Sequence, residues 1–403
     1  MSGSFTRVSE KSIFSEPERP CMKNKLLIIQ YSLAGGGAEK VLCDILNRID
    51  YDRFDVTLLL FQKYGVYLPA VPEKVRIKVF DPAEMTFGWK LLFNRWTAKL
   101  VPSGLWTRLK LHKALGLCGK YDCIVSFMEG WSVAVHSNLR SRARRNVTWV
   151  HIDMLANHYS SGFFKNEAAE TEAYDRMDEI VFVSEQAREA FFKLFAREYP
   201  ARVIYNLIEK DDIIRKSSES CPVEKRRKYV LCNVGRLAPQ KRQDRLIRVV
   251  ARLWHDYGLD VEAWIVGEGE LEADLRRLAK DLKVDDRVVF CGFQTNPYPL
   301  IKNADIFVLT SDAEGLPVVV SEALCLGKPI VATRITGPTE LLAEDAGLLT
   351  SMDENEIALK IKVLLDDCTL RGHYETMARR RSEMFCPDKS IEQIYAVISG
   401  ENS

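Results

Sequence analysis

Short apolar runs alternate with amphipathic stretches along this chain, and the whole series occurs twice. The first apolar run, at 25–31, is closed by the glycines at 35–37, and a helical pattern follows. One face of that helix would carry Ala38, Val41, Leu42, Ile45, Leu46 and Ile49. A run without polar alternation is typical of a strand that is buried on both faces of a parallel sheet. The repetition therefore predicts α/β domains with helices on both faces of each sheet.

The expected elements form two series, separated by a polar stretch at 209–228. In the first series we expect strands at 25–31, 54–61, 75–80, 121–127, 147–152 and 180–183. In the second we expect strands at 228–233, 261–266, 287–291, 306–309 and 329–332, with helices at 243–255 and 271–282. A polar stretch between two such series indicates a domain boundary. We expect two doubly wound domains, at 23–207 and 208–387, which face each other across a cleft where ligands bind.

Composition limits the class of protein. The chain has 403 residues, of which 47% are hydrophobic and 28% charged, as in globular proteins and unlike fibrous or disordered chains. No apolar run approaches the ~18 residues of a membrane helix. Residues 1–22 read as a flexible extension without a signal-peptide core, and either Met1 or Met22 could be the natural start. The ten cysteines show no metal or redox spacing, so we expect a cytosolic protein. An isoelectric point of about 7.5 argues against nucleic acid as a partner.

Two glycine-rich turns lie between an expected strand and an expected helix. Gly35, Gly36 and Gly37 precede the helix at 38–49, where glycine lets a ligand approach the backbone and free N–H groups face an anion. Gly267 and Gly269 form a similar turn after the strand at 261–266. For the first turn, an anion site and a simple tight turn both remain open. In the second the full G-x-G-x-x-G pattern is absent, so the approach of one nucleotide and a simple turn after the strand both remain open.

A third turn places two cations close together in the sequence. Gly235 and Arg236 follow the strand at 228–233, and Lys241 comes five residues after Arg236. An arginine fork and a lysine point charge across one turn could close on a single diphosphate. The alternative is a pair of solvated surface cations, but the position at the carboxyl end of a strand favours a site.

The sharpest pattern is a pair of glutamates eight residues apart. Glu314 precedes Gly315, Leu316 and Pro317, and Glu322 follows within the expected helix. Proline is tolerated in the first turn of a helix, which places Glu314 in the loop before it. Glu322 would then lie among apolar residues, where a carboxylate needs hydrogen-bond donors. Sugar or ribose hydroxyls could supply them, and the alternative is an exposed Glu322 without a role.

With these motifs in this order, the sequence resembles the retaining glycosyltransferases of the GT-B fold, in the large family of bacterial glycan and lipopolysaccharide assembly enzymes. The E-x7-E pattern from Glu314 to Glu322 is the specific part, and the resemblance covers roughly residues 23–400. It implies two Rossmann-like domains, an acceptor domain at 23–207 and a donor domain at 208–387, with a last helix at 388–403 that crosses back onto the first. It also implies transfer of a hexose or N-acetylhexosamine from a nucleotide sugar, with UDP as the expected nucleotide.

The resemblance also implies roles for individual residues. Arg236 and Lys241 would hold the donor diphosphate, Glu314 would contact the donor sugar, and Glu322 would bind the ribose. His151 would lie near the sugar, as would the loop at 335–338. The implied catalytic residues are His151, Arg236, Lys241 and Glu314. The implied donor-binding residues are Gly36, Gly37, Gly235, Gly267, Gly269, Phe293, Gly315, Leu316, Pro317 and Glu322.

The expected mechanism needs neither a metal nor a bound cofactor. Negative charge grows on the leaving phosphate, and Arg236 and Lys241 would stabilise it in a water-poor cleft. The resemblance implies retention through attack on the same face, with the leaving phosphate taking the proton of the acceptor. Two alternatives stay open: an epimerase or phosphorylase of the same fold, and a sensor that binds a nucleotide sugar without consuming it.

One basic and aromatic stretch points to the acceptor. Residues 89–113 interleave Lys and Arg with Trp, Leu and Phe and contain no Asp or Glu. This mixture is typical of an interfacial membrane patch. We therefore expect docking on an anionic membrane surface, a lipid-linked glycan acceptor, and a peripheral place on the inner face of the plasma membrane. The alternative is a pair of amphipathic helices that pack into the core.

Overall fold

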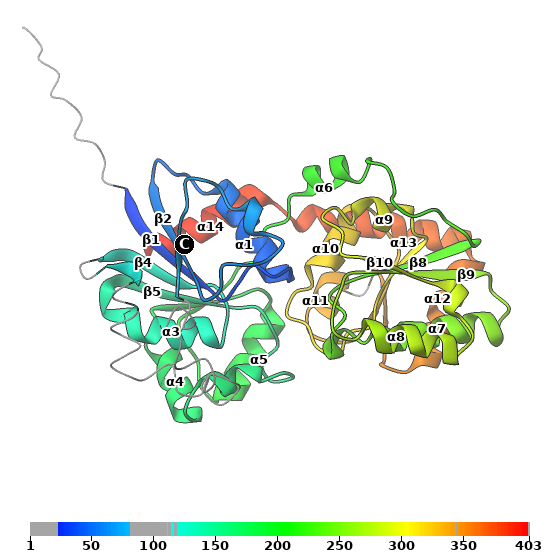
Figure 1. The fold of residues 1–403 in the computed structure, drawn as a ribbon, viewed down its shortest axis with the longest axis horizontal. Coiled ribbons are helices and arrows are strands. Elements are labelled where there is room, and N and C mark those ends of the chain that lie inside the picture. Colours follow the sequence, from blue (N-terminus) through cyan, green and yellow to red (C-terminus); the bar gives the residue numbers. More distant parts are fainter. Residues whose placement is uncertain (1–22, 81–110, 112–113, 117–118, 344, 402–403) are drawn as a thin grey trace, which may run out of the picture.

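The computed structural model describes residues 23–401 except 81–110, 112–113, 117–118 and 344. Two parallel sheets form the centres of two α/β domains, which lie side by side in Figure 1. The expected class, two doubly wound α/β domains, is confirmed. Within the described residues, no helix is long and apolar enough to cross a membrane.

The first sheet has the strand order β3-β2-β1-β4-β5-β6-β7, and all neighbours pair in parallel. Its strands are β1 Asn24–Gln30, β2 Phe54–Leu60, β3 Arg76–Val79, β4 Tyr121–Ser126, β5 Ala143–Val150, β6 Glu179–Phe182 and β7 Ala201–Val203. The central strand β1 is buried from Leu26 to Gln30, as its apolar run predicts. The order in which strands are added to the sheet reverses between β1 and β4. Ligands of such folds bind at this switch point, at the carboxyl ends of the strands.

Helices cover both faces of this sheet. They are α1 Gly37–Arg48, α3 Trp131–Leu139, α4 Glu167–Asp175 and α5 Glu185–Phe195, with short 3-10 turns η1 Leu68–Ala70, η4 Arg140–Arg142 and η5 Tyr159–Phe163. Helix α1 buries Val41, Leu42, Ile45 and Leu46, four members of the predicted face. Gly36 is its N-cap, so the predicted glycine turn does open onto a helix N-terminus.

The second sheet has the order β10-β9-β8-β11-β12-β13, again with parallel neighbours. Its strands are β8 Tyr229–Val234, β9 Val261–Val266, β10 Val288–Gly292, β11 Ile306–Leu309, β12 Ile330–Thr333 and β13 Leu348–Thr350. Its helices are α6 Lys210–Lys216, α7 Gln243–His255, α8 Glu272–Asp281, α9 Tyr298–Asn303, α10 Val318–Cys325, α11 Pro338–Leu342, α12 Glu354–Asp366 and α13 Cys368–Arg381, with the 3-10 turns η6 Pro239–Lys241, η7 Asp285–Arg287 and η8 Ser382–Met384.

The last helix, α14 Pro387–Ser399, lies on the first domain (Figure 1). Tyr395 stacks on Phe54 of β2, with ring centroids 5.2 Å apart. Its hydroxyl accepts a hydrogen bond from the backbone N–H of Asp50 at 2.8 Å. Arg145 of β5 donates through Nε to the carbonyl of Val397 at 2.6 Å. The chain therefore crosses between the domains near 204–208 and again near 384–387.

Candidate functional site

The predicted motifs meet where the carboxyl ends of the two sheets face each other. The glycine turn before α1 lies against the second domain, because a Cβ added to Gly37 would lie 3.3 Å from Cγ2 of Val318, the first residue of α10. A Cβ added to Gly35 would lie 3.9 Å from the ring of Phe293. Gly37 therefore packs against the start of α10, and Gly35 packs against Phe293, whereas a Cβ at Gly36 would meet Glu39 of its own helix.

Lys241 and Glu314 form an ion pair in the second domain. Lys241 Nζ lies 2.6 Å from Glu314 Oε1, and the hydroxyl of Ser311 donates to the same oxygen at 2.7 Å. Glu314 is only 7% exposed and lies in the loop between β11 and α10, as predicted. The sequence analysis assigned Lys241 to a diphosphate and Glu314 to a sugar, and the structure places the two side chains in direct contact.

Arg236 differs from Lys241 in its surroundings. Its side chain is exposed and forms no ion pair with any residue that the structure describes. Its charge nevertheless reaches Glu39 in α1 of the first domain. Burial raises the pKa of Glu39, and Arg236 works against that rise across the cleft. An unpaired guanidinium at the junction of two domains is available to an anion.

Glu322 is 2% exposed, so the exposed alternative is wrong. The donors that its carboxylate needs come from the protein: Tyr298 donates its hydroxyl to Oε1 at 3.0 Å, and Lys40 Nζ of the first domain lies 3.5 Å from the same oxygen. Burial raises the pKa of Glu322, while Lys40 opposes that rise. Burial also works to lower the pKa of Lys40, but Glu322 and Asp44 hold it well above its usual value.

The sequence analysis missed Lys40 and Tyr298. Neither belongs to a recognisable motif, because Lys40 reads as an ordinary charged position of α1 and Tyr298 as the start of α9. Lys40 also pairs with Asp44 one turn along α1, at 2.8 Å. A lysine and an aspartate at this spacing on a helix are usually a solvated pair. Their link to Glu322 follows only from the way the two domains are closed.

Close backbone packing explains why glycine stands at 267 and 269, and the sequence did not show this reason. A Cβ at Gly267 would lie 2.1 Å from the carbonyl oxygen of Gly235, and one at Gly269 would lie 2.3 Å from that of Leu237. Gly267 also has φ +137°, a backbone conformation that favours glycine. The turns after β8 and β9 are thus packed backbone to backbone, joined by a hydrogen bond from Leu237 N–H to Glu268 O at 2.9 Å.

A second glycine contact joins the two domains. A Cβ at Gly315 would lie 2.1 Å from the carbonyl oxygen of His151, and one at Gly337 would lie 2.2 Å from that of Gly315. The neighbouring Leu316 is buried, and its carbonyl accepts a hydrogen bond from Asn206 Nδ2 at 3.1 Å. Pro317 directly precedes α10 and is its N-cap. The loop of the predicted E-x7-E pattern therefore touches the first domain at His151.

His151 is held without charge. Its ring lies against Phe127, with centroids 4.9 Å apart, and its buried Nε2 has no hydrogen-bond partner in the described part of the chain. Burial lowers the pKa of His151 to about 3. A neutral imidazole with an unpartnered nitrogen beside the cleft can accept or donate one hydrogen bond to a bound group.

Glu129, a buried carboxylate that the sequence analysis missed, holds the backbone at His151 in place. Glu129, 3% exposed, follows β4 and accepts the backbone N–H of His151 at 2.9 Å through Oε2. Its Oε1 accepts the hydroxyl of Tyr159 at 2.5 Å. Burial raises the pKa of Glu129, and these two donors oppose the rise. A lone glutamate after a strand gives no sequence signal of such a role.

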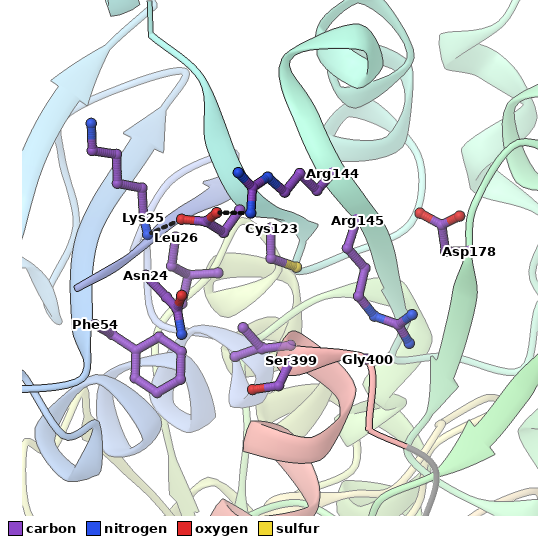
Figure 2. A pocket seen from close by; sticks show the side chains of 12 residues that line it. Asn24, Lys25, Leu26, Phe54, Cys123, Arg144, Arg145, Asp178, Ser399 and Gly400 are labelled. Atoms are coloured by element: carbon purple, nitrogen blue, oxygen red, sulfur yellow. Dashed lines mark hydrogen bonds and ion pairs between the residues drawn. The ribbon is translucent and has the colours of Figure 1, made fainter. Parts of the chain in front are cut away.

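Two cavities stand out. One, of about 520 Å³, opens between the domains and reaches Glu314 and Thr336. The other, of about 370 Å³, lies at the amino ends of β1, β4 and β5, beside the end of α14 (Figure 2). Of the predicted site residues, Glu314 lines the inter-domain cavity, and none lines the second cavity. Among the described residues, no group of three or more His, Cys, Asp and Glu could hold a metal ion.

Comparison with solved structures identifies the class of fold. A crystal structure of Anabaena HepE in complex with UDP-glucose superposes with a TM-score of 0.74 at 23% sequence identity, covering 94% of this chain and 100% of that one. At this identity the likeness concerns the fold, and the fold is GT-B, as the resemblance implied.

Comparison with sequences relates the chain to glycosyltransferases. Residues 216–381 match the family described as "Glycosyl transferases group 1". The chain is 28% identical to an N-acetylgalactosaminyltransferase of Campylobacter jejuni over 369 residues, which are 90% of this chain and 95% of that enzyme. By its name, that enzyme acts on N-acetylgalactosamine-N,N'-diacetylbacillosaminyl-diphospho-undecaprenol. It is 33% identical over 171 residues to the lipopolysaccharide core biosynthesis glycosyltransferase LpsD of Rhizobium meliloti, covering 41% of this chain and 48% of LpsD. The chain is thus related to group 1 glycosyltransferases that build lipid-linked and lipopolysaccharide glycans.

Proposed function

We propose that this chain is a glycosyltransferase that moves a hexose or N-acetylhexosamine from a UDP-sugar to a lipid-linked glycan, with retention of the anomeric configuration. The observation that carries the proposal is the cleft itself. Lys241 pairs with Glu314 in the second domain, and the adjacent Gly315 lies against the His151 carbonyl of the first domain. The glycine turn of the first domain lies against α10, in a chain related to group 1 glycosyltransferases.

The charges of the cleft suit the bond that must break. Negative charge grows on the leaving diphosphate, and Arg236, which has no carboxylate partner among the described residues, would meet it together with Lys241. Losing one such preorganised contact raises the barrier by about 3 kcal/mol. Positive charge grows on the sugar ring, where Glu314 would lie. Lys241 would then face the negative charge on the diphosphate and Glu314 the positive charge on the sugar ring, at the two ends of the breaking bond.

The proposal of retention uses the leaving phosphate as the proton acceptor. Glu129 is a buried carboxylate of the first domain near His151, but both of its oxygens already accept hydrogen bonds, from His151 N–H and from Tyr159. We therefore give Glu129 a positioning role. The leaving phosphate would take the proton of the acceptor while attack occurs on the same face.

The acceptor is proposed to be lipid-linked, and the protein to work at the inner surface of the plasma membrane. The Campylobacter relative acts, by its name, on a diphospho-undecaprenol acceptor. The predicted membrane-docking stretch 89–113 lies outside the described residues except for Leu111. Co-sedimentation with vesicles that contain anionic lipid at low salt would test this part, and an absence of binding would contradict it.

A thermal-shift panel with UDP, GDP and ADP tests the donor site. A nucleotide at 100 times its Kd stabilises the fold by about 2.7 kcal/mol, which raises Tm by several degrees. We expect UDP to give this shift and Arg236→Gln to lose most of it, since Arg236 is exposed and its replacement leaves the fold intact. No shift with any nucleotide would contradict the proposal.

Turnover separates the transferase from its alternatives. Incubation of the protein with a UDP-sugar should release UDP rapidly when an acceptor is present. Without an acceptor, UDP should be released only slowly, by transfer of the sugar to water. A free epimerised sugar product without an acceptor would indicate an epimerase. Donor binding that is never followed by consumption, with any acceptor extract, would indicate a sensor.

A further inference from the structure

Lys40 of the first domain lies between two carboxylates that belong to different domains. Its Nζ lies 2.8 Å from Oδ2 of Asp44, one turn along α1, and 3.5 Å from Oε1 of Glu322, in α10 of the second domain. The side chain of Asp44 is 24% exposed and that of Glu322 only 3%. Two carboxylates therefore share one ammonium group at the junction of the domains, and Glu322 is the more deeply buried of the two.

The two oxygens of the Glu322 carboxylate differ in their contacts. Tyr298 of α9 donates its hydroxyl to Oε1 at 3.0 Å, and Lys40 pairs with the same oxygen. None of the residues that the structure describes donates a hydrogen bond to Oε2. One oxygen thus holds the side chain in place, and the other keeps its capacity to accept hydroxyl groups of a ligand. Such hydrogen bonds are stronger when the carboxylate is ionised.

The charge of Glu322 depends on the groups around it. Among the described residues, the charged and titratable groups with which it interacts are Lys40 and Asp44 of α1, Tyr67 before η1, Tyr298 of α9 and Cys325 of α10 itself. Burial raises the pKa of Glu322, and Lys40 opposes that rise more than the other groups do. Lys40 is the cation of this set. Without it, two carboxylates would face each other with no positive charge between them, and one would take up a proton.

We propose that Lys40 is a positioning residue for the donor: from the first domain it keeps Glu322 of the second domain charged and in place, so that Glu322 accepts the ribose hydroxyls of the nucleotide. The inference rests on the proposed function and on the ribose-binding role that the family resemblance implies for Glu322. Because Lys40 and Glu322 belong to different domains, their contact would also make recognition of the ribose depend on closure of the cleft.

Calorimetry with two nucleotides measures how strongly the ribose is recognised. UDP carries both ribose hydroxyls, whereas 2′,3′-dideoxy-UDP keeps the base and the diphosphate but lacks these hydroxyls. The ratio of the two Kd values therefore isolates the hydroxyl contacts. We expect the unaltered protein to prefer UDP by at least about tenfold, because hydrogen bonds to a charged group are strong. Lys40→Met should reduce this preference to about twofold or less near pH 6.5, while its affinity for 2′,3′-dideoxy-UDP changes little.

The pH dependence of this ratio separates a role of charge from a role of shape. Loss of Lys40 raises the pKa of Glu322 further, so the carboxyl group of Lys40→Met is protonated near neutral pH and regains its charge as the pH rises. The preference of this variant for UDP should therefore return toward that of the unaltered protein by about pH 9. The diphosphate titrates alike in both nucleotides, so its ionisation cancels in the ratio.

Lys362→Met is the matched control. Lys362 also pairs with an aspartate one turn further along its helix, Asp366 of α12, but this pair lies within the second domain. Its removal should leave the ratio unchanged at every pH. Lys40→Arg keeps the positive charge and should keep most of the preference for UDP. Lys40→Gln, which keeps a polar N–H group at the junction, serves as a second variant without charge and should behave like Lys40→Met.

A preference for UDP in the charge-free variants equal to that of the unaltered protein would overturn the proposal. A preference that stays low up to pH 9 would also overturn it, because Lys40 would then support only the shape of the site. Equal binding of the two nucleotides by the unaltered protein would do the same, since the ribose would not be recognised. If the unaltered protein binds neither nucleotide, the proposed function itself is contradicted, so the two failures are distinguishable.

Discussion

At the scale of residues, Glu129 is the clearest case of a side chain that holds another in place. Its two oxygens accept from His151 N–H and from the hydroxyl of Tyr159. Glu129→Gln can keep both contacts, because its amide oxygen can accept from His151 while its amide nitrogen donates to the Tyr159 oxygen. Glu129→Ala leaves the N–H of His151 and the hydroxyl of Tyr159 without their acceptor. We expect Glu129→Ala to lower the free energy of unfolding by about 2 kcal/mol.

Chemical denaturation at neutral pH measures this difference between the two variants. Glu129→Gln should differ little from the unaltered protein in stability and should keep most of the transferase rate. Equal destabilisation by Gln and by Ala would show that the charge of Glu129, and not its geometry, matters at this position.

A second residue-scale prediction concerns pH. His136 is fully buried between Ser126 Oγ, at 3.0 Å from Nδ1, and Asn146 Oδ1, at 3.1 Å from Nε2. Burial lowers its pKa to about 4. Between pH 4 and 6.5 the unfolded chain therefore binds a proton at this histidine that the folded protein does not, so the free energy of unfolding rises with pH across this window. The slope from one such group is about 1.4 kcal/mol per pH unit.

Urea titrations at pH 5 and pH 6 measure the slope. His136→Gln should be less stable overall but should show a smaller rise between the two pH values, because the buried imidazole is gone. His151, with its pKa lowered to about 3, adds a slope of the same sign and remains in the variant. An unchanged slope in His136→Gln would contradict the assignment.

The site residues were predictable from the sequence where they come after a predicted strand of an α/β domain. Glu314, Lys241 and Glu322 come after predicted strands, and the structure places all three at the carboxyl edge of the second sheet or directly beyond it. Their partners were not predictable. Lys40 and Tyr298 supply the contacts to Glu322, and the pattern of the sequence offers no reason to join them.

At the scale of elements, apolar runs predicted the central strands closely. The predicted strand at 261–266 and the predicted helix at 243–255 have the bounds of β9 and α7. The edge strands β7 and β13 were missed. Each has only three residues, and neither Ala201–Val203 nor Leu348–Thr350 is a long enough run to be distinguished from a loop.

Gly315 lies where the loop before α10 touches His151, directly after the end of β5. Gly315→Ala would place a Cβ 2.1 Å from the carbonyl oxygen of His151, which is backbone and cannot rotate away. Overpacking of this kind costs about 1–3 kcal/mol, and the strain can be relieved by separating the two domains locally. We expect amide hydrogen exchange at 151–156 to be roughly tenfold faster, since about 1.4 kcal/mol corresponds to a factor of ten.

Gly372→Ala is the control for this substitution. Gly372 lies in α13 of the same domain, and a Cβ added there meets nothing within 4 Å. Alanine in the interior of a helix should stabilise the protein by up to about 1 kcal/mol and leave exchange at 151–156 unchanged. Slow exchange in Gly315→Ala, equal to that of the unaltered protein, would show that the contact is not needed for closure.

At the scale of the whole molecule, closure depends on polar contacts between the domains that no local pattern encodes. Thr336 donates to Asp153, Asn206 donates to Leu316 O, and Lys40 pairs with Glu322. Each contact joins residues far apart in the chain, so sequence periodicity gives the two domains but not the angle between them. The chemistry proposed for the cleft depends on that angle, because Arg236 and Lys241 belong to one domain and His151 to the other.

Glu340 of α11 makes the most extensive of these contacts. Its carboxylate accepts the backbone N–H groups of Glu185 and Gln186, both at 3.0 Å, at the N-terminus of α5. It also accepts the hydroxyl of Tyr205, at 2.7 Å, where the chain first crosses between the domains. A carboxylate at a helix N-terminus is stabilised both by these donors and by the helix dipole. Here the helix and the carboxylate belong to different domains.

Glu340→Ala should therefore loosen the closed arrangement without unfolding either domain. The α5 N-terminus loses its partner across the junction, and removal of charge-assisted hydrogen bonds of this kind costs about 2 kcal/mol. We expect a larger radius of gyration in small-angle scattering of the unliganded protein, and a partial return to the compact value with UDP and an acceptor. Glu354→Ala, which removes an ion pair with Arg248 inside the second domain, should leave the radius unchanged. If Glu340→Ala is as compact as the unaltered protein, the cap on α5 does not hold the domains together, and the glycine contacts at His151 carry the closure instead.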